Sequence, residues 1–172
     1  CSITGLPGHE IENLTLTNIR LSFDGGGSRE DARREIPERE KSYPESTMFG
    51  TLPGWGFYCR HVRGLEFTDL QLETTEPDLR HAMVFDDAAD VHISGLDARF
   101  SPGAAPLLRM TNVRRAKIAG LSSKSPIDTL LALEGKQTKQ ISLRQNDLGN
   151  VAKVAVLASD VPGKALEQEP SP

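Results

Sequence analysis

The feature that most constrains the fold of this chain is a sequence repeat of about 25 residues. Apolar residues stand at the same relative positions in five units, which start at positions 11, 62, 88, 113 and 138. The later starts are 26, 25 and 25 residues apart, and the first interval of 51 residues is about two periods long. Repeats of about 20 to 50 residues are typical of solenoids, in which each unit packs only on its neighbours.

Each repeat predicts two short strands joined at a sharp corner. In the unit that starts at Ile11, Leu14 and Leu16 alternate with polar residues, which indicates a strand with one buried face. The strand is followed by a residue type that tolerates a left-handed backbone, and another apolar pair begins after it. These corner residues are Asn18, Asp69, Gly95 and Gly120. A further strand precedes most units, at Phe57–Cys59, Met83–Phe85, Leu107–Met110, Leu130–Leu133 and Val154–Leu157.

Short strands that recur once per 25 residues, with turns between them, predict an all-β fold, a right-handed parallel β-helix of about six coils. A leucine-rich repeat is the main competitor at this period, but its asparagine-containing signature and helical half are missing. A β-sandwich would need hairpin turns, and Asn-Gly or Asp-Gly dipeptides at hairpin spacing are nearly absent. We therefore predict a single domain over residues 1–160, followed by a flexible tail over 161–172 that could also cover the last coil.

Residues 24–56 interrupt the repeat as one long insertion. Ser28 and Asp31 have the form of a capping box, which predicts a short helix from Glu30 to about Ile36 that Pro37 stops. The run 29–41 holds five acidic and five basic residues, which is typical of a solvated surface. Five of the nine aromatic residues then fall within positions 43–58.

A long loop that carries aromatic residues and leaves a rigid solenoid is where a binding site is expected. Aromatic faces pack on the C–H faces of sugar rings, and charged neighbours hydrogen-bond to hydroxyls or carboxylates. Two alternatives stay open: the segment folds over the solenoid as a small satellite core, or it forms a protein interface. The candidate substrate-binding residues are Tyr43, Glu45, Trp55, Arg60 and His61.

The charge, histidine and cysteine content limit the kinds of partner and site that this chain can have. The formal net charge is −4 and the charges are mixed along the chain, which argues against a nucleic-acid partner. No apolar run approaches the roughly 20 residues of a membrane span.

The four histidines show no metal-ligand spacing, so we predict neither a metal site nor a cofactor. Cys1 leaves a lipidated N-terminus open, and the exposed first coil over residues 2–23 could support self-association.

Several phrases of the sequence resemble a known family. Gly5-Leu-Pro-Gly-His9, Tyr43-Pro-Glu45, Met48-Phe49-Gly50 and Gly56-Phe-Tyr-Cys-Arg-His61 are similar to bacterial polygalacturonase-like proteins of glycoside hydrolase family 28. The similarity covers residues 2–123 and corresponds to the C-terminal part of the family's domain. It implies a pectin-lyase-like β-helix, a pectic or related acidic polysaccharide as partner, inverting hydrolysis by aspartates, and a secreted or periplasmic location.

The sequence departs from the family where catalysis is concerned. The family's Asn-Thr-Asp stretch has no counterpart, and Gly8-His9-Glu10 differs from Gly-His-Gly at its last position. Asp86-Asp87 matches a family dipeptide but follows His9, the reverse of the family order, so we interpret it as the turn that closes a coil. We therefore predict a C-terminal part that contributes substrate-binding loops and no catalytic residues. The alternative is a non-catalytic β-helical module that binds carbohydrate or protein, and whether the chain is an enzyme stays open.

Overall fold

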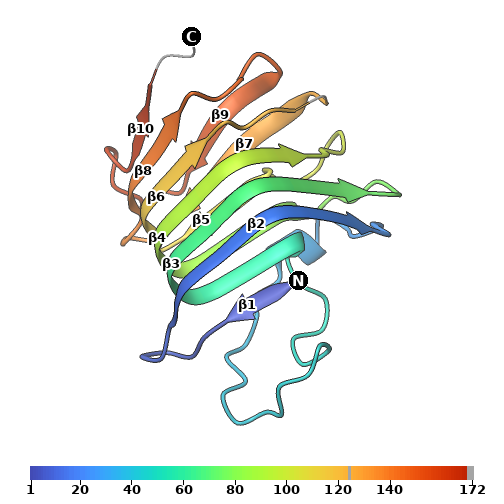
Figure 1. Ribbon diagram of the computed structural model, residues 1–172, viewed down its shortest axis with the longest axis vertical. Helices are drawn as coiled ribbons and strands as arrows, with labels where there is room; N and C mark the ends of the chain where they lie inside the picture. Colours follow the sequence, from blue (N-terminus) through green and yellow to red (C-terminus); the bar gives the residue numbers. More distant parts are fainter. Residues whose placement is uncertain (124, 170–172) are drawn as a thin grey trace.

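The computed structural model describes residues 1–123 and 125–169, and most of them lie in β-strands (Figure 1). The strands follow the repeat, because each apolar alternation places one row of side chains on the inner face. They are β1 (Ser2–Thr4), β2 (Ile11–Phe23), β3 (Gly54–Thr74), β4 (His81–Ala98), β5 (Leu108–Thr111), β6 (Arg114–Ala119), β7 (Ile127–Glu134), β8 (Lys139–Arg144), β9 (Val151–Leu157) and β10 (Leu166–Gln168), and a 3-10 helix, η1 (Asp31–Arg33), lies between β2 and β3.

The named strands pair in parallel, and their register follows the 25-residue repeat. Leu16 lies opposite Phe67, Phe67 opposite Ile93, Ile93 opposite Ile118, and Ile118 opposite Leu143. One stack runs through β2, β3, β4, β6, β8 and β10, and the other through β1, β3, β4, β5, β7 and β9. The long strands β3 and β4 bend and belong to both stacks. The predicted all-β parallel solenoid is therefore confirmed.

The solenoid has about four turns, fewer than the six coils that the sequence predicts. Four levels have strand neighbours on both sides, namely β3, β4, β5 with β6, and β7 with β8. The strands β1 with β2 and β9 with β10 form the two ends and pair on one side only. The count of six was too high because it took these one-sided end levels as full coils.

Three corners of the coil are ladders of residues with positive φ in the described part of the chain. At the predicted corner, φ is 55° at Asn18, 53° at Asp69, 71° at Gly95 and 62° at Gly120, which confirms this prediction. The same conformation recurs at two corners that the sequence reading did not specify. One ladder runs through His61, Asp87, Asn112 and Gly135, and the other through Asn13, Gly64, Asp90, Arg115 and Gln140.

The interior between the strands is apolar and continuous along the stack. The ring of Phe67 lies edge-on to those of Phe57 and Phe85, with centroids 5.0 and 6.5 Å apart. Each such buried side chain stabilises the fold by about 1.5–3 kcal/mol relative to exposure. At the β2 end the corresponding side chains, such as Leu14 and Leu16, are only partly buried. This leaves a half-covered apolar level at that end, and self-association through it stays a prediction.

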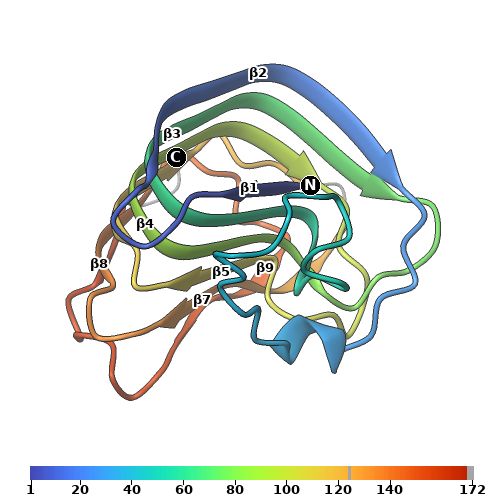
Figure 2. The same ribbon diagram turned by 90° about the horizontal axis from the view of Figure 1, so that it is seen from below.

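The insertion spans 24–53, since β3 already begins at Gly54 and includes Trp55. The capping box is present: Asp31 N–H donates to Ser28 Oγ at 3.1 Å, and Ser28 N–H donates to Asp31 Oδ2 at 3.0 Å. The expected helix over 30–36 is limited to η1, because backbone at Arg34 is already extended, with ψ of 133°. Figure 2 shows the coils superposed along the stack, with η1 outside the strands on one side, and in Figure 1 the later part of the insertion, in cyan, extends below β1 at the end of the stack.

The C-terminal segment differs from the expected flexible tail over 161–172. Val161 and Ala165 are buried, and Leu166–Gln168 form β10, which pairs with β8. The segment therefore continues the sheet over the last turn, in keeping with the alternative that the tail covers the final coil. Residues 170–172 of the expected tail lie outside the described residues.

Candidate functional site

A buried arginine attaches the insertion to the solenoid. The Arg60 side chain is 2% exposed, and its Nη1 and Nη2 donate to the backbone oxygens of Ile36 and Pro37 at 2.6 and 3.1 Å. Nη1 also lies 3.5 Å from Glu38 Oε1, and the guanidinium lies 5.5 Å from the ring centroid of Phe49. A buried charge needs such partners, so the two Nη groups of Arg60 are paired only while the insertion lies in place, whereas its buried Nε has no hydrogen-bond partner among the described residues.

The next residue, His61, joins the insertion to the following turn. Its Nδ1 lies 2.7 Å from Asp87 Oδ2, and its Nε2 lies 3.1 and 3.2 Å from the two oxygens of Glu38. An imidazole that carries both protons donates to both carboxylates at once. Because His61 and Asp87 occupy the same corner on neighbouring turns, this contact fixes the insertion relative to the strand stack.

Beyond this attachment, residues 38–49 enclose an open pocket against the first turn, with a volume of about 680 Å³. Its apolar wall combines Ile3, Leu6 and Ile11 of the solenoid end with Met48 and Phe49 of the insertion. We call this cavity the insertion pocket. Apolar walls of this kind suit the C–H face of a small ring, and few polar groups then decide the orientation of a ligand.

The rim of the insertion pocket is acidic. Glu38, Glu40 and Glu45 line it together with one cationic side chain, Arg39. Carboxylate oxygens accept hydrogen bonds, so this rim suits ligand groups that donate them, above all hydroxyls. An ionised ligand carboxylate would be repelled at the same position.

The structure separates the five residues singled out in the sequence. Tyr43 is 83% exposed, and Glu45 lines the insertion pocket. Trp55 is 6% exposed and packs edge-on against Phe23, with ring centroids 5.8 Å apart, so its face is not open to a sugar. Arg60 and His61 are buried beneath the insertion, and the Nη atoms of Arg60 and the ring nitrogens of His61 contact the protein itself. The side chains of Trp55, Arg60 and His61 are therefore buried in this structure, and their contact with a substrate stays a prediction.

Glu38 was missed in the sequence although it joins Arg60 and His61 to the pocket rim. It lies in the mixed charge run, and its partner His61 is 23 positions away along the chain. No short motif links such distant residues.

Asp86 and Asp87 lie at a corner inside β4, where the sequence predicts a turn that closes a coil. Asp87 has φ of 47°, and its carboxylate is held by His61. Burial raises the pKa of the Asp86 carboxyl, and the guanidinium groups of Arg60 and Arg109 oppose that rise. The two carboxyls therefore have different environments. Because the corner accounts for the position of both residues, we assign neither of them a catalytic role.

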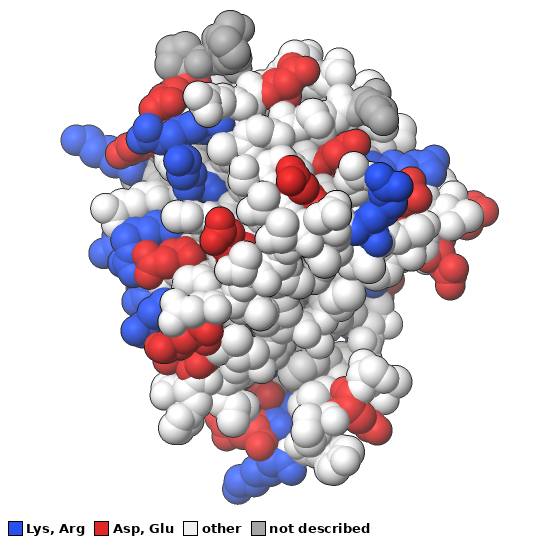
Figure 3. Space-filling model, viewed as in Figure 1, with Lys and Arg blue, Asp and Glu red and all other residues white. Residues whose placement is uncertain are grey.

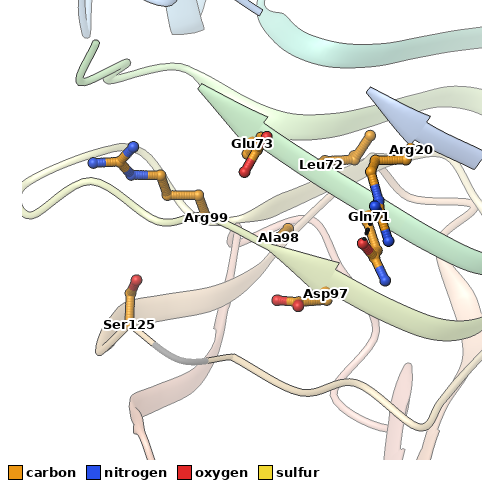
Figure 4. A pocket seen from close by; sticks show the side chains of 8 residues that line it. All are labelled: Arg20, Gln71, Leu72, Glu73, Asp97, Ala98, Arg99 and Ser125. Carbon is orange, nitrogen blue, oxygen red and sulfur yellow. Dashed lines mark hydrogen bonds between the residues drawn. The ribbon is translucent and has the colours of Figure 1, made fainter. Parts of the chain in front are cut away.

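A second, more polar pocket of about 410 Å³ lies at the ends of β2, β3 and β4 (Figure 4). Arg20 Nε donates to Gln71 Oε1 at 2.8 Å, and these two residues occupy the same outward row as Asp97. The Glu73 and Asp97 side chains lie between Arg20 on one side and Arg99 on the other. Positive and negative groups balance here, so the pocket has no net preference for ligand charge.

The face of the molecule in the view of Figure 1 carries mixed charge. Figure 3 shows Lys and Arg side chains interspersed with Asp and Glu on the face in view. Among residues 1–123 and 125–169, no three His, Cys, Asp or Glu side chains gather in a way that could hold a metal ion. The same described residues contain no helix with the length and apolar character needed to cross a membrane.

Comparison of the chain with protein-family models, curated proteins and solved structures finds no match. The resemblance to polygalacturonase-like glycoside hydrolases is thus carried by the quoted residues alone and stays a prediction. The β-solenoid itself does not depend on that resemblance, since the repeat and the strand register carry it.

Proposed function

We propose that this protein is a carbohydrate-contacting β-solenoid of the polygalacturonase-like glycoside hydrolase type, corresponding to the C-terminal part of that domain. Its substrate class is pectic or related acidic polysaccharide. The observation that carries the proposal is the insertion pocket, an open cavity of about 680 Å³ with an apolar wall and an acidic rim. The family resemblance of Tyr43-Pro-Glu45 and Met48-Phe49-Gly50, which lie in or beside this pocket, supports the same assignment.

In this proposal the pocket holds the hydroxyl-bearing part of one sugar ring. Met48 and Phe49 pack on its C–H face, and Glu45 accepts hydrogen bonds from its hydroxyls. Because the rim is acidic, a carboxylate on the same sugar or its neighbour points to solvent. Arg60 and His61 act as positioning residues, since they hold Glu38 and the preceding backbone against the solenoid.

The chain contributes contacts to the polysaccharide and no catalytic aspartates. We therefore expect it to bind pectic oligosaccharides and to release no reducing sugar from them. A saturable titration by calorimetry with galacturonate oligosaccharides and with neutral galactan oligosaccharides tests the binding. Glu45→Gln is expected to weaken the affinity about tenfold, which corresponds to about 1.4 kcal/mol.

Glu35→Gln provides a matched control, because Glu35 is an exposed carboxylate of the same insertion that does not line the pocket. It should bind as the wild type does. Tyr43→Ser adds a test of the exposed aromatic beside the pocket. Equal affinity of the wild type and the Glu45→Gln variant, or no binding of any glycan, would contradict the proposal.

A further inference from the structure

A separate groove of about 290 Å³ lies between η1 and the outer face of β5, β7 and β9. Ala132 and Val156 form part of its floor, and Ala105 and Pro106 contribute to its wall. Ala132 and Val156 are register partners on neighbouring strands, so their side chains give a flat aliphatic strip. The groove is separate from the insertion pocket, because the two cavities share no lining residue.

Three guanidinium groups line this groove, from Arg29, Arg33 and Arg109. Arg109 is fixed in place, since its Nε and Nη2 lie 2.9 and 2.8 Å from Glu134 Oε2. Its Nη1 also donates to the backbone oxygen of Ala32 at 3.5 Å, which links the strand face to η1. The Arg109 guanidinium is therefore already engaged by groups of the protein that line the groove.

The other two cations are available to a ligand. Arg29 and Arg33 are exposed, and within the described part of the chain their side chains make no ion pair or hydrogen bond. The nearby carboxylate of Asp31 is instead engaged by Ser28 and lies 3.7 Å from Arg34. Three guanidinium groups against the single carboxylate of Glu134 leave the lining positively charged.

His81 completes the wall without adding charge. It is 5% exposed, and its Nδ1 lies 2.5 Å from the backbone oxygen of Pro106. Burial lowers the pKa of His81 to about 4, so the imidazole is neutral near pH 7. The attraction for an anion therefore comes from the arginines.

We propose that this groove binds a ring-borne carboxylate, with Arg29 and Arg33 clamping the carboxylate and the ring lying on the strip formed by Ala132 and Val156. Guanidinium groups match carboxylates in charge and in planar hydrogen-bond geometry. An aliphatic floor of this kind contacts a ring face and disfavours small inorganic anions. Such a ligand has two sources, a sugar acid or a ring acid that is not a sugar, and both present the same chemistry.

The test uses methyl NMR of the whole protein, with the Ala132 and Val156 signals as local reporters. Galacturonate and cyclohexanecarboxylate are titrated separately, with galactose and inorganic phosphate as matched probes that lack the carboxylate or the ring. We expect at least one ring acid to shift these signals saturably, and its affinity to fall at least tenfold in the R29Q/R33Q variant. The ring acid that binds identifies the source.

R34Q is the control, because Arg34 lies on the same segment but does not line the groove. It should bind as the wild type does, and Glu45→Gln should too, which separates this site from the proposed function. The inference is overturned if neither ring acid shifts the two reporters, if R29Q/R33Q binds as tightly as the wild type, or if phosphate or galactose binds equally well.

Discussion

His61 Nδ1 lies 2.7 Å from Asp87 Oδ2, across two neighbouring turns of the solenoid. Both residues have positive φ, at 51° and 47°, so the same corner conformation places the two side chains together. The opposite nitrogen of His61 reaches Glu38 in the insertion. The corner of a regular repeat thus becomes the attachment point of the least regular segment in the chain.

Loss of the His61 side chain should loosen the insertion and leave the solenoid folded. In His61→Ala, Glu38 and Asp87 lose their shared donor, and hydrogen bonds to charged groups contribute about 1.5–3 kcal/mol to stability. We expect the free energy of unfolding to fall by about that amount and amide exchange over residues 36–50 to accelerate. Amide hydrogen exchange with mass spectrometry measures the second effect directly.

Tyr43→Ser is a suitable control for this experiment, because the Tyr43 side chain is 83% exposed in the same insertion. Its effect on stability should stay within about 0.5 kcal/mol. Unchanged exchange over residues 36–50 in His61→Ala would contradict the role of His61 in holding the insertion.

Trp55 should behave as a core residue in solution. It is the single tryptophan of the chain, and it is 6% exposed against Phe23. We expect blue-shifted emission that acrylamide quenches poorly and that changes little when pectic oligosaccharides bind. Trp55→Ala should cost about 3–5 kcal/mol of stability, as for other buried large aromatics. Strong quenching of the native protein by acrylamide would show that the residue faces solvent.

His81 should make the fold sensitive to acid. Burial lowers its pKa to about 4 in the folded chain, whereas an unfolded histidine titrates near about 6.5. Between these values the unfolded chain binds the extra proton, so stability decreases as pH falls from about 6.5 to about 4. The full shift corresponds to about 3 kcal/mol.

The pH dependence can be isolated by comparing chemical denaturation of the wild type and His81→Gln at several pH values. The difference in their free energies of unfolding should change across this window, since the variant lacks the titrating group. His92→Gln removes an exposed histidine and serves as the control. Parallel curves for the wild type and His81→Gln would refute the assignment.

Much of the solenoid could be predicted because its pattern of apolar residues is local and recurs in each repeat. Leu16, Phe67, Ile93, Ile118 and Leu143 share one template position and prove to share one ladder. The predicted number of coils was too high because a strand at either end of the solenoid has the same apolar pattern as a strand in its middle. The helix expected after Ser28 stopped at η1 because the following backbone is extended to meet Arg60.

The sequence alone determined the strands, the corner at Asn18 and its equivalents, and the parallel stacking, because alternation and left-handed residue types act over a few neighbouring positions. It also marked the insertion as the place to look for a site. Only the tertiary structure decided that Trp55, Arg60 and His61 are buried while Glu45 lines a pocket. Those outcomes depend on where the insertion folds back, and that path is set by contacts such as Glu38 with His61, between residues that no local pattern connects.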